Sequence, residues 1–356
     1  MDRSVQIKKI KSSARGREIV ISDIHANLQL YQKLLQKLRY IPNRDRLILL
    51  GDLIEKGNQN LEMVHFVMQQ VKEEDVHCIM GNCDFIAKNV LFNYRLSFLR
   101  SVLASRKNSL IHEMADQLHI SYETMPMDRY CQCLREHFLE ELSFLNDLPH
   151  VIESEDRIYA HSAISSEENY GKDFKEVMAQ PMFLKRNNSF HKTVVVGHMP
   201  VTEYCTTIAS FDPIYDAKQN VWSIDGGNMV KEGGQLNALI FDHGRISTER
   251  IDDLPEKRVV NDVKPRIQIP FFINWNNGKI EILEKNETQC LVYSPYLHRT
   301  FWIDRFFIHE NKGTDYTNYE IPLKKGDYVK IVCTYHDKIQ VKKDGLLGWT
   351  YKKNID

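Results

Sequence analysis

The chain has 356 residues, of which 42% are hydrophobic and 27% are charged, a composition typical of globular proteins and not of disordered or fibrous ones. Its 47 Lys and Arg residues balance 48 Asp and Glu residues, which excludes a net field that would attract a nucleic acid polymer, a membrane surface or an acidic partner. A chain of this length is longer than the usual domain with a single hydrophobic core, so we expect two domains.

Targeting signals and a disulfide pattern are not evident in the sequence. The basic residues between Lys8 and Arg17 are not followed by the apolar core of a signal peptide, and no apolar run is long enough to span a bilayer. The 7 cysteines are odd in number and irregularly spaced, which favours reduced thiols. Cys131 and Cys133 lie close together but have no second pair with which to hold zinc. We therefore expect a cytoplasmic protein with no membrane partner.

Short apolar strands alternate with amphipathic helices in the first part of the chain, which is typical of a layered α/β fold. A strand is predicted at residues 17–25 and a helix with leucines at helical spacing at residues 27–40. Strand, helix and strand follow at residues 45–52, 60–74 and 76–84. Two consecutive β-α-β units predict parallel strand pairing with right-handed crossovers.

The pattern then changes, and residues 86–148 are predicted to form a helical insertion over the sheet edge. Strands return in the segments that end near residues 162, 199, 227 and 247. We place a first domain at residues 1–255, including the insertion, and a linker that loses periodicity at 256–267. Short β-like runs separated by Gly, Asn and Asp predict a small β-barrel at 268–356.

Polar residues follow directly on five of the apolar strands of the first domain. Because the carboxyl ends of parallel strands open onto one crevice, residues far apart in the sequence are expected to meet there. Carboxylate, imidazole and amide oxygen groups suit first-row divalent cations. The expected metal ligands are Asp23, His25, Asp52, Asn82, His161 and His198.

This ligand set predicts two divalent cations that share one carboxylate. Asp23, His25 and Asp52 would hold the first ion, and Asp52 would also belong to the second, together with Asn82, His161 and His198. Two cations less than about 4 Å apart can hold a bridging hydroxide and direct it at phosphorus. Asp225 precedes two glycines and is expected to be a turn residue instead of a ligand.

The segments SDIHAN, GDLIEKG, GNCD, YAHS and VVGHMP resemble, in order, the motif blocks of the calcineurin-like metallophosphoesterases over roughly residues 17–245. Each segment alone has a simpler explanation, such as a buried histidine, a helix cap or a turn. The set is specific because all five occur in one order. GDLIEKG and the proline of VVGHMP look more like the phosphoprotein phosphatase branch, which includes bacterial Ser/Thr phosphatases and diadenosine tetraphosphate hydrolases.

The resemblance implies an α/β fold of layered α+β type, with a β-sandwich flanked by helices. It also implies two divalent metal ions as cofactors, with Mn as the first expectation and Fe, Zn or Ni as alternatives. The segments GDYVKIV and KKDGLLGWTY resemble bacterial SH3-like domains. Trp349 and Tyr351 there are expected to fill the core of the barrel, with a binding groove for a protein or peptide partner as the alternative.

The sequence departs from the phosphoprotein phosphatase pattern at four positions. Cys83 occupies the place of the histidine that protonates the leaving oxygen, and Asp84 replaces a glutamate. A thiol beside two cations has a lowered pKa and is a poor proton donor. Lys56 replaces an arginine and loses its bidentate contact with phosphate, and Glu55 replaces an aspartate. The candidate catalytic residues are Asp52, Lys56, Asn82, Cys83 and Asp84.

The combined pattern predicts a phosphoesterase that hydrolyses phosphate esters with a metal-bridging hydroxide. A phosphoprotein is the first substrate expectation, as for a Ser/Thr phosphatase-like phosphomonoesterase, and a dinucleoside polyphosphate or cyclic nucleotide is the second. A protein of another class, a non-catalytic scaffold stabilised by metal, is the alternative that Cys83 favours. The complete ligand set argues against the scaffold.

Overall fold

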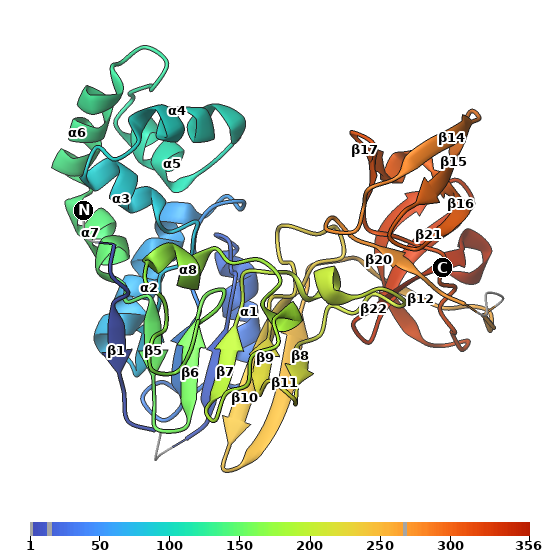
Figure 1. Ribbon diagram of the computed structural model, residues 1–356, viewed down its shortest axis with the longest axis horizontal. Helices are drawn as coiled ribbons and strands as arrows, with labels where there is room; N and C mark the ends of the chain where they lie inside the picture. The colour runs from blue at the N-terminus through green and yellow to red at the C-terminus, as the bar shows by residue number, and fades with distance from the viewer. Residues whose placement is uncertain (1–2, 13–15, 266–268) are drawn as a thin grey trace. The chain divides into compact units, whose positions relative to one another are not determined.

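The computed structural model describes residues 3–12, 16–265 and 269–356. These residues form two compact units, coloured along the chain in Figure 1. The first consists of Met1–Met199 and Pro213–Asp252, and the second of Pro200–Asp212 and Asp253–Asp356. No helix within the described ranges is both long and apolar enough to cross a membrane.

The first unit contains two mixed β-sheets (Figure 1). The strands of one sheet are, in spatial order, β1 (Ile7–Lys9), β5 (Val151–Glu153), β6 (Arg157–Ala160), β7 (Thr193–Val196), β9 (Val221–Ser223) and β8 (Ile214–Asp216). Those of the other are β11 (Arg245–Ile251), β10 (Leu236–Asp242), β2 (Glu18–Ile21), β3 (Arg46–Leu49) and β4 (Val76–Cys78).

The two sheets face each other across a shared apolar core. Val20 of β2 and Ile48 of β3 lie in one buried cluster with Tyr159 of β6 and Val195 of β7. Successive side chains of a strand point to opposite faces, so the neighbours of these residues lie on the outer faces of the sheets. Ile21 accordingly belongs to a second, larger buried cluster that includes helical residues. The arrangement is a β-sandwich with helices packed outside it.

Helices α1 (Leu28–Lys37) and α2 (Asn60–Glu73) follow β2 and β3 along the chain. The side chain of Asn27 caps α1 by accepting a hydrogen bond from the backbone N–H of Leu30 at 3.3 Å. The hydroxyl of Tyr31 donates to the side-chain oxygen of Gln70 at 2.8 Å, which joins the two helices in a buried position. Each helix connects parallel strands, so the predicted β-α-β units are present at β2, β3 and β4.

The sheets are mixed because later strands join in the opposite direction. β10 pairs antiparallel with β2 and with β11. The β10–β11 turn contains His243 and Gly244 with φ values of 46° and 83°, the left-handed conformation that tight hairpins use. β1 pairs parallel with β5 at the far edge of the other sheet. Local periodicity predicted neither pairing, since both depend on residues far apart in the sequence.

The region predicted as a helical insertion is helical in the structure. It contains α3 (Ile86–Leu91), α4 (Leu96–Ser105), α5 (Leu110–Gln117), α6 (Met127–His137) and α7 (Leu139–Asp147). Leu134, Leu142 and Leu145 are buried and belong to the large cluster of the sandwich. The short helix α8 (Phe174–Met178) and the 3-10 turn Phe183–Lys185 lie between β6 and β7 in the sequence.

The second unit contains antiparallel sheets. One sheet has the order β12 (Glu256–Arg258), β20 (Tyr328–Tyr335), β21 (Lys338–Lys343) and β22 (Leu346–Tyr351). Another joins β14 (Glu281–Lys285), β15 (Gln289–Ser294) and β16 (Arg299–Asp304). Two short pairs are β13 (Phe272–Ile273) with β19 (Tyr316–Thr317) and β17 (Ile308–His309) with β18 (Lys312–Gly313). The 3-10 turns of this unit are Val201–Tyr204, Arg305–Phe307 and Lys352–Asn354.

Two segments of the second unit lie near the predicted domain boundaries, which stay predictions. Residues 256–258 of the predicted linker form strand β12, and residues 266–268 lie outside the described residues. Pro200–Asp212 joins this unit although it begins at the proline of the VVGHMP segment. The Asn274 side-chain amide explains this, because it donates to the backbone carbonyls of Thr202, Glu203 and Cys205 at 3.3, 2.9 and 3.1 Å.

The SH3-like form of the C-terminal region stays a prediction. Trp349 is buried, and its ring N–H donates to the carbonyl of Thr317 at 2.8 Å. The ring of Phe307 packs edge-on against it, with ring centres 5.7 Å apart. Trp349 is therefore a core residue of this unit, and with Tyr351 it also lines a cavity of about 100 Å³.

Candidate active site

The carboxyl ends of parallel strands from both sheets lie at one edge of the sandwich. β2, β3 and β4 are parallel in one sheet, and β6, β7 and β9 in the other. The residues that follow them connect the sheets. The backbone N–H of His198 donates to Asp23 Oδ2 at 2.9 Å, and His161 Nδ1 lies 2.7 Å from the carbonyl oxygen of Leu50. The strand ends of the two sheets thus meet in one place.

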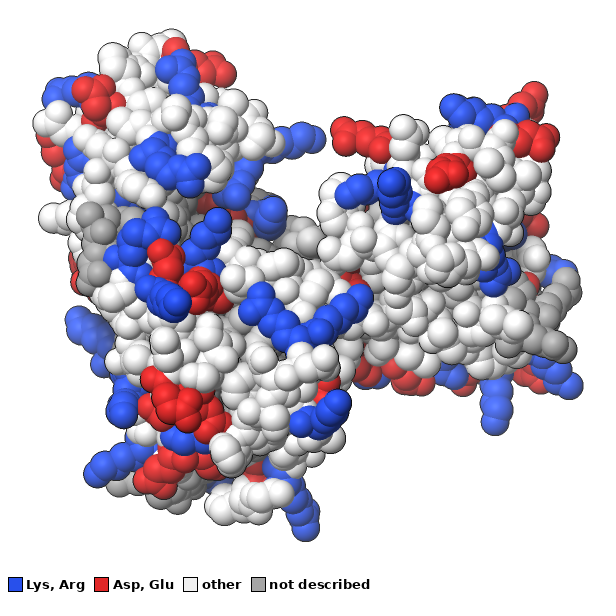
Figure 2. Space-filling model, in the orientation of Figure 1, with Lys and Arg blue, Asp and Glu red and all other residues white. Residues whose placement is uncertain are grey.

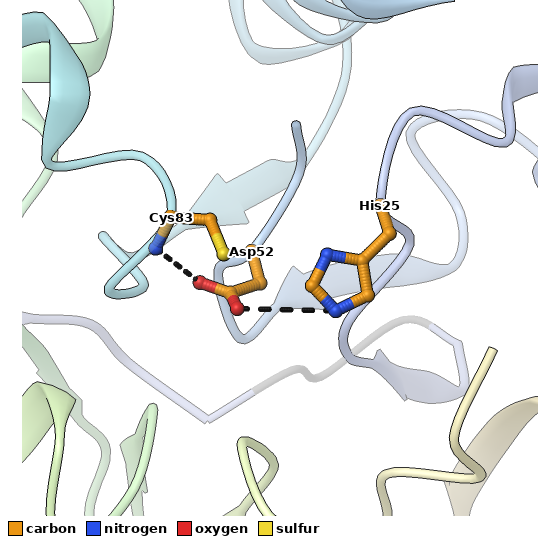
Figure 3. Close-up of side chains that lie close together, drawn as sticks. All are labelled: His25, Asp52 and Cys83. Carbon is orange, nitrogen blue, oxygen red and sulfur yellow. Dashed lines mark hydrogen bonds and ion pairs between the residues drawn. The ribbon is translucent and has the colours of Figure 1, made fainter. Parts of the chain in front are cut away.

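Asp52 lies at the centre of this group. Its Oδ1 atom lies 3.4 Å from His161 Nε2 and accepts a hydrogen bond from the backbone N–H of Cys83 at 2.8 Å. Its Oδ2 atom lies 3.9 Å from His25 Nε2. Figure 3 shows the Asp52 carboxylate between His25 and Cys83, which project from different loops. One carboxylate therefore faces donors from both sheets.

The remaining residues of the predicted ligand set lie around the same point. Asn82 Oδ1 lies 3.1 Å from His161 Nε2, and the rings of His161 and His198 are 5.1 Å apart between centres. Asp23 Oδ1 lies 4.0 Å from His25 Nε2. Asn82 is exposed and His198 is half-buried, whereas His25 and His161 are buried. The site is thus open to a ligand on the Asn82 side.

Two groups of side chains in the described part of the chain have donor atoms within 4.8 Å of one another. One is His25, Asp52 and Cys83, and the other is Asp23, Asp52 and His161. Asp52 belongs to both, as a shared carboxylate between two cations requires. Cys83 enters the first group in addition to the oxygen and nitrogen ligands that the sequence pattern indicates.

The charges of the site fit a divalent cation. Burial lowers the pKa of His25, and burial followed by the neighbouring His161 lowers the pKa of His198 to about 4. Both imidazoles are thus neutral at pH 7, which is the form that binds a metal. Burial, then Asp225 and Asp52, raises the pKa of Asp23 well above its ordinary value. Several buried carboxylates repel one another unless a cation lies among them.

Asp52 itself is held in the ionised form. Burial alone would raise the pKa of its carboxyl group, but His161, His25 and the N–H of Cys83 lower that pKa to about 2. The Asp52 carboxylate therefore carries a negative charge throughout the neutral range. An ionised, buried carboxylate is a favourable ligand for a divalent cation.

The backbone of the site is in an uncommon conformation. Asp23, His25, Asp52 and His198 have φ values of 55°, 52°, 50° and 67°, in the left-handed region that non-glycine residues seldom adopt. Such strain persists only where the surroundings impose it, and it gathers at functional sites. Gly81 lies so close to Asp52 that a Cβ atom would collide with the carboxylate. A side chain at this glycine would displace the central ligand.

The three remaining candidate catalytic residues have different environments. Asp84 is buried, and its carboxylate accepts hydrogen bonds from the N–H groups of Asp52, Leu53 and Gly81 at 2.8, 3.0 and 2.8 Å. It therefore joins the loops after β3 and β4. Lys56 is exposed. Burial, then the Asp52 carboxylate, raises the pKa of the Cys83 thiol well above its ordinary value, the opposite direction to that expected for a thiol beside two cations.

Two contacts at the edge of the site were not predicted from the sequence. Arg106, between α4 and α5, forms an ion pair with Glu55, which is fully buried beside Lys56. Asp225 is buried and close enough to Asp23 to raise its pKa, while its Oδ1 accepts from the N–H of Gly227 at 2.7 Å as the turn prediction requires. No local motif marks either contact, because each joins segments distant in the sequence.

Comparisons with known proteins identify the family. Residues 17–215 match the calcineurin-like phosphoesterase family. Symmetrical bis(5'-nucleosyl)-tetraphosphatase of Chromobacterium violaceum is 36% identical over 64 residues, which cover 18% of this chain and 22% of that protein. The protein of the same name from Pseudomonas fluorescens strain Pf0-1 is 33% identical over 87 residues, which cover 23% of this chain and 29% of that protein. The chain thus spans less than a third of the length of these two relatives.

A structural relative is a protein serine/threonine phosphatase of Saccharomyces cerevisiae with similarity to human phosphatase PP5. It superimposes with a TM-score of 0.44 and 11% sequence identity, covering 71% of this chain and 85% of that chain. The family match extends over more than half of the chain and includes the strand ends at which Asp23, Asp52, Asn82, His161 and His198 lie. The chain belongs to the calcineurin-like phosphoesterase family.

Proposed function

We propose that the protein is a hydrolase that cleaves phosphoric anhydrides or esters of nucleotides with two divalent cations, dinucleoside polyphosphates being the first candidate substrates. The observation that carries the proposal is the position of Asp52 within both donor groups. The ligands would be Asp23, His25, Asp52, Asn82, His161 and His198. When bound, two divalent cations lower the pKa of a water molecule and neutralise charge on phosphate.

Other residues of the chain would orient the phosphate and hold the ligand loops in place. Asn82 is exposed and adjoins His161, so its amide is placed to orient a phosphate at the open side of the site. Lys56 is exposed near Glu55 and would contribute a positive charge to the same phosphate. Asp84 would act as a positioning residue, since its carboxylate holds the N–H groups of both loops.

The leaving group favours a nucleotide anhydride over a phosphoprotein. A serine alkoxide leaves poorly and needs a proton from a general acid, the task of the histidine whose place Cys83 takes. A nucleoside phosphate is a much better leaving group and does not depend on that proton. The relatives named bis(5'-nucleosyl)-tetraphosphatase support the same choice. A phosphoprotein remains the alternative substrate.

A substrate panel tests this proposal. Protein loaded with Mn is mixed with diadenosine tetraphosphate, a Ser/Thr phosphopeptide, and mono- and bis-nitrophenyl phosphate, and the products are quantified. We expect the fastest turnover with diadenosine tetraphosphate. Turnover of the phosphopeptide alone would replace the nucleotide proposal with the phosphatase alternative. Failure with every substrate by protein that binds the metal would favour the scaffold.

A further inference from the structure

A cavity of about 250 Å³ in the first unit opens beside Asn82, next to the proposed metal centre. Its volume is just below the range of about 300–1,000 Å³ that is usual for small-molecule sites. Its walls come from the N-terminal segment, the start of α3, the start of α4 and helix α8. The aromatic residues among them are Phe85, Tyr94, Phe98 and Phe174.

Three of the aromatic rings, those of Phe85, Tyr94 and Phe174, are in contact. The rings of Phe85 and Phe174 have centres 5.2 Å apart, and those of Phe85 and Tyr94 are 6.2 Å apart in an edge-on arrangement. Phe98 lines the same cavity, and its side chain is 46% exposed. The wall thus offers an accessible ring on which a flat group can stack.

The charged residues of the cavity are all positive. Arg3, Arg95 and Lys175 line it, and no acidic side chain is among the lining residues that the structure describes, although Arg3 forms an ion pair with Asp173 outside the lining. The guanidinium of Arg95 lies over the ring of Phe98 at 4.8 Å from its centre. Figure 2 shows that positive and negative side chains are interspersed over the visible face, so the positive sign of this cavity is a local feature. An anionic ligand would be held by these residues and not by the net charge.

The cavity is built from segments that hold one another in place. The Arg3 guanidinium donates to Asp173 at 2.6 Å, and the Arg3 carbonyl accepts from the N–H of Phe174 at 3.0 Å. Asn89 Nδ2 donates to the carbonyl of Tyr94 at 2.8 Å. The next residue, Arg95, has a φ of 51°, an uncommon conformation that these contacts maintain. The loop before α4 is therefore fixed at Arg95, and Phe98 follows in the first turn of α4.

We infer that this cavity is a nucleoside subsite, in which a base stacks on Phe98 while Arg95 and Lys175 bind the attached phosphates and Asn82 connects them to the metal centre. The inference rests on the proposed hydrolase function and specifies how its substrate is recognised. Aromatic rings beside basic side chains suit a nucleotide, because the base can stack on a ring and the phosphates carry negative charge. A phosphopeptide with an aromatic side chain is the competing occupant.

Nucleotide binding tests the subsite independently of turnover. ADP is titrated into the full chain, with and without Mn, and the heat of binding is measured for Phe98→Ala, Arg95→Ala and the control Phe92→Ala. Phe92 is 52% exposed on the same insertion but does not line the cavity. Loss of stacking by one base costs about tenfold in affinity. We expect that loss for Phe98→Ala and Arg95→Ala, and no change for Phe92→Ala.

The outcomes separate the subsite from the proposed function. Wild-type affinity in both cavity variants would overturn the subsite, even if the protein hydrolyses diadenosine tetraphosphate. Weakened ADP binding would support the subsite even if no substrate of the panel were turned over. A loss of phosphopeptide binding by Phe98→Ala, with ADP binding intact, would assign the cavity to a peptide and overturn the nucleoside inference. Circular dichroism of each variant shows whether it is folded.

Discussion

At the scale of single residues, the site depends on buried carboxylates that are held by backbone N–H groups. Asp84 accepts three such bonds from the loops that carry Asp52 and Gly81. Each N–H would remain unsatisfied in a buried place without it. The position of Asp52 therefore depends on Asp84, although Asp84 does not belong to either donor group.

Asp84→Asn tests this dependence. An amide has only one accepting oxygen, so at least one buried N–H group loses its partner, and we expect the free energy of unfolding to fall by about 1–3 kcal/mol. Urea denaturation at pH 7 measures the change. Asp116→Asn, at an exposed position of α5, is the matched control and should leave stability unchanged. Equal stability of wild type and Asp84→Asn would contradict the structural role of Asp84.

Asp45, which lies away from the site, should make the free energy of unfolding depend on pH. Burial would raise the pKa of this carboxyl group, but hydrogen bonds from the Arg17 guanidinium and the N–H of Ile41 outweigh burial and lower it. A lowered pKa in the folded protein stabilises it above the ordinary Asp pKa of about 4, and this contribution is lost as the pH falls further. Asp45→Asn should therefore destabilise the protein at pH 7 and lose most of that effect below the folded-state pKa. Urea denaturation midpoints of wild type and Asp45→Asn, measured from pH 7 down to below the folded-state pKa, test this prediction. A difference between the two proteins that does not change with pH would contradict it.

At the scale of elements, the helical insertion does more than cover the sandwich. The segment between α4 and α5 brings Arg106 onto the fully buried Glu55, whose second oxygen accepts from the N–H of Leu110 at 3.2 Å. Lys56, the candidate phosphate contact, is the next residue along the chain. The conformation of that loop is thus coupled to the insertion.

Removal of Arg106 should expose this coupling. Arg106→Ala leaves the buried Glu55 carboxylate without its cation, and we expect a loss of about 2 kcal/mol in the free energy of unfolding. The double variant Glu55→Gln with Arg106→Ala should recover part of it, because a neutral amide does not require a cation. Thermal and urea unfolding of the single and double variants measure both steps. No recovery in the double variant would show that the charge of Glu55 is not the cause.

At the scale of the whole molecule, two units are connected by a chain that passes between them more than once. Pro200–Asp212 belongs to the second unit, while the strands before and after it belong to the first. The segment that carries His198 ends at the first of these passages. The predicted ligands lie on both sides of the helical insertion, with Asp23 and Asp52 before it and His198 after it. A cation bound at the strand ends would therefore connect these two parts of the first unit.

Metal binding should raise the stability of the protein. A ligand that binds only the folded state adds about 2.7 kcal/mol at a concentration one hundred times its dissociation constant. We expect Mn to raise the thermal unfolding midpoint, and a chelator to reverse the rise. Asp52→Asn should abolish the shift and reduce bound metal in elemental analysis, because Asp52 belongs to both donor groups. An undiminished shift in Asp52→Asn would contradict its central position.

The sequence alone predicted the strands that carry the candidate ligands, the helical insertion and the residues that follow each of those strands, but not β1, β5 or β8. It could do so because these features are local: apolar runs predict β2, β3 and β7, and Asp23, Asp52 and His198 follow them within a few residues. The family resemblance rested on the same short segments. Their roles as ligands stay predictions, and the structure adds that their side chains lie together.

Only the tertiary structure decided which distant segments meet. The antiparallel entry of β10, the pairing of β1 with β5, the contact of Arg106 with Glu55 and the nearness of Asp225 to Asp23 have no local signal. Each is a contact between residues far apart in the chain. Such contacts are chosen by the packing of the whole core and by charge pairing across it, which no window of the sequence contains.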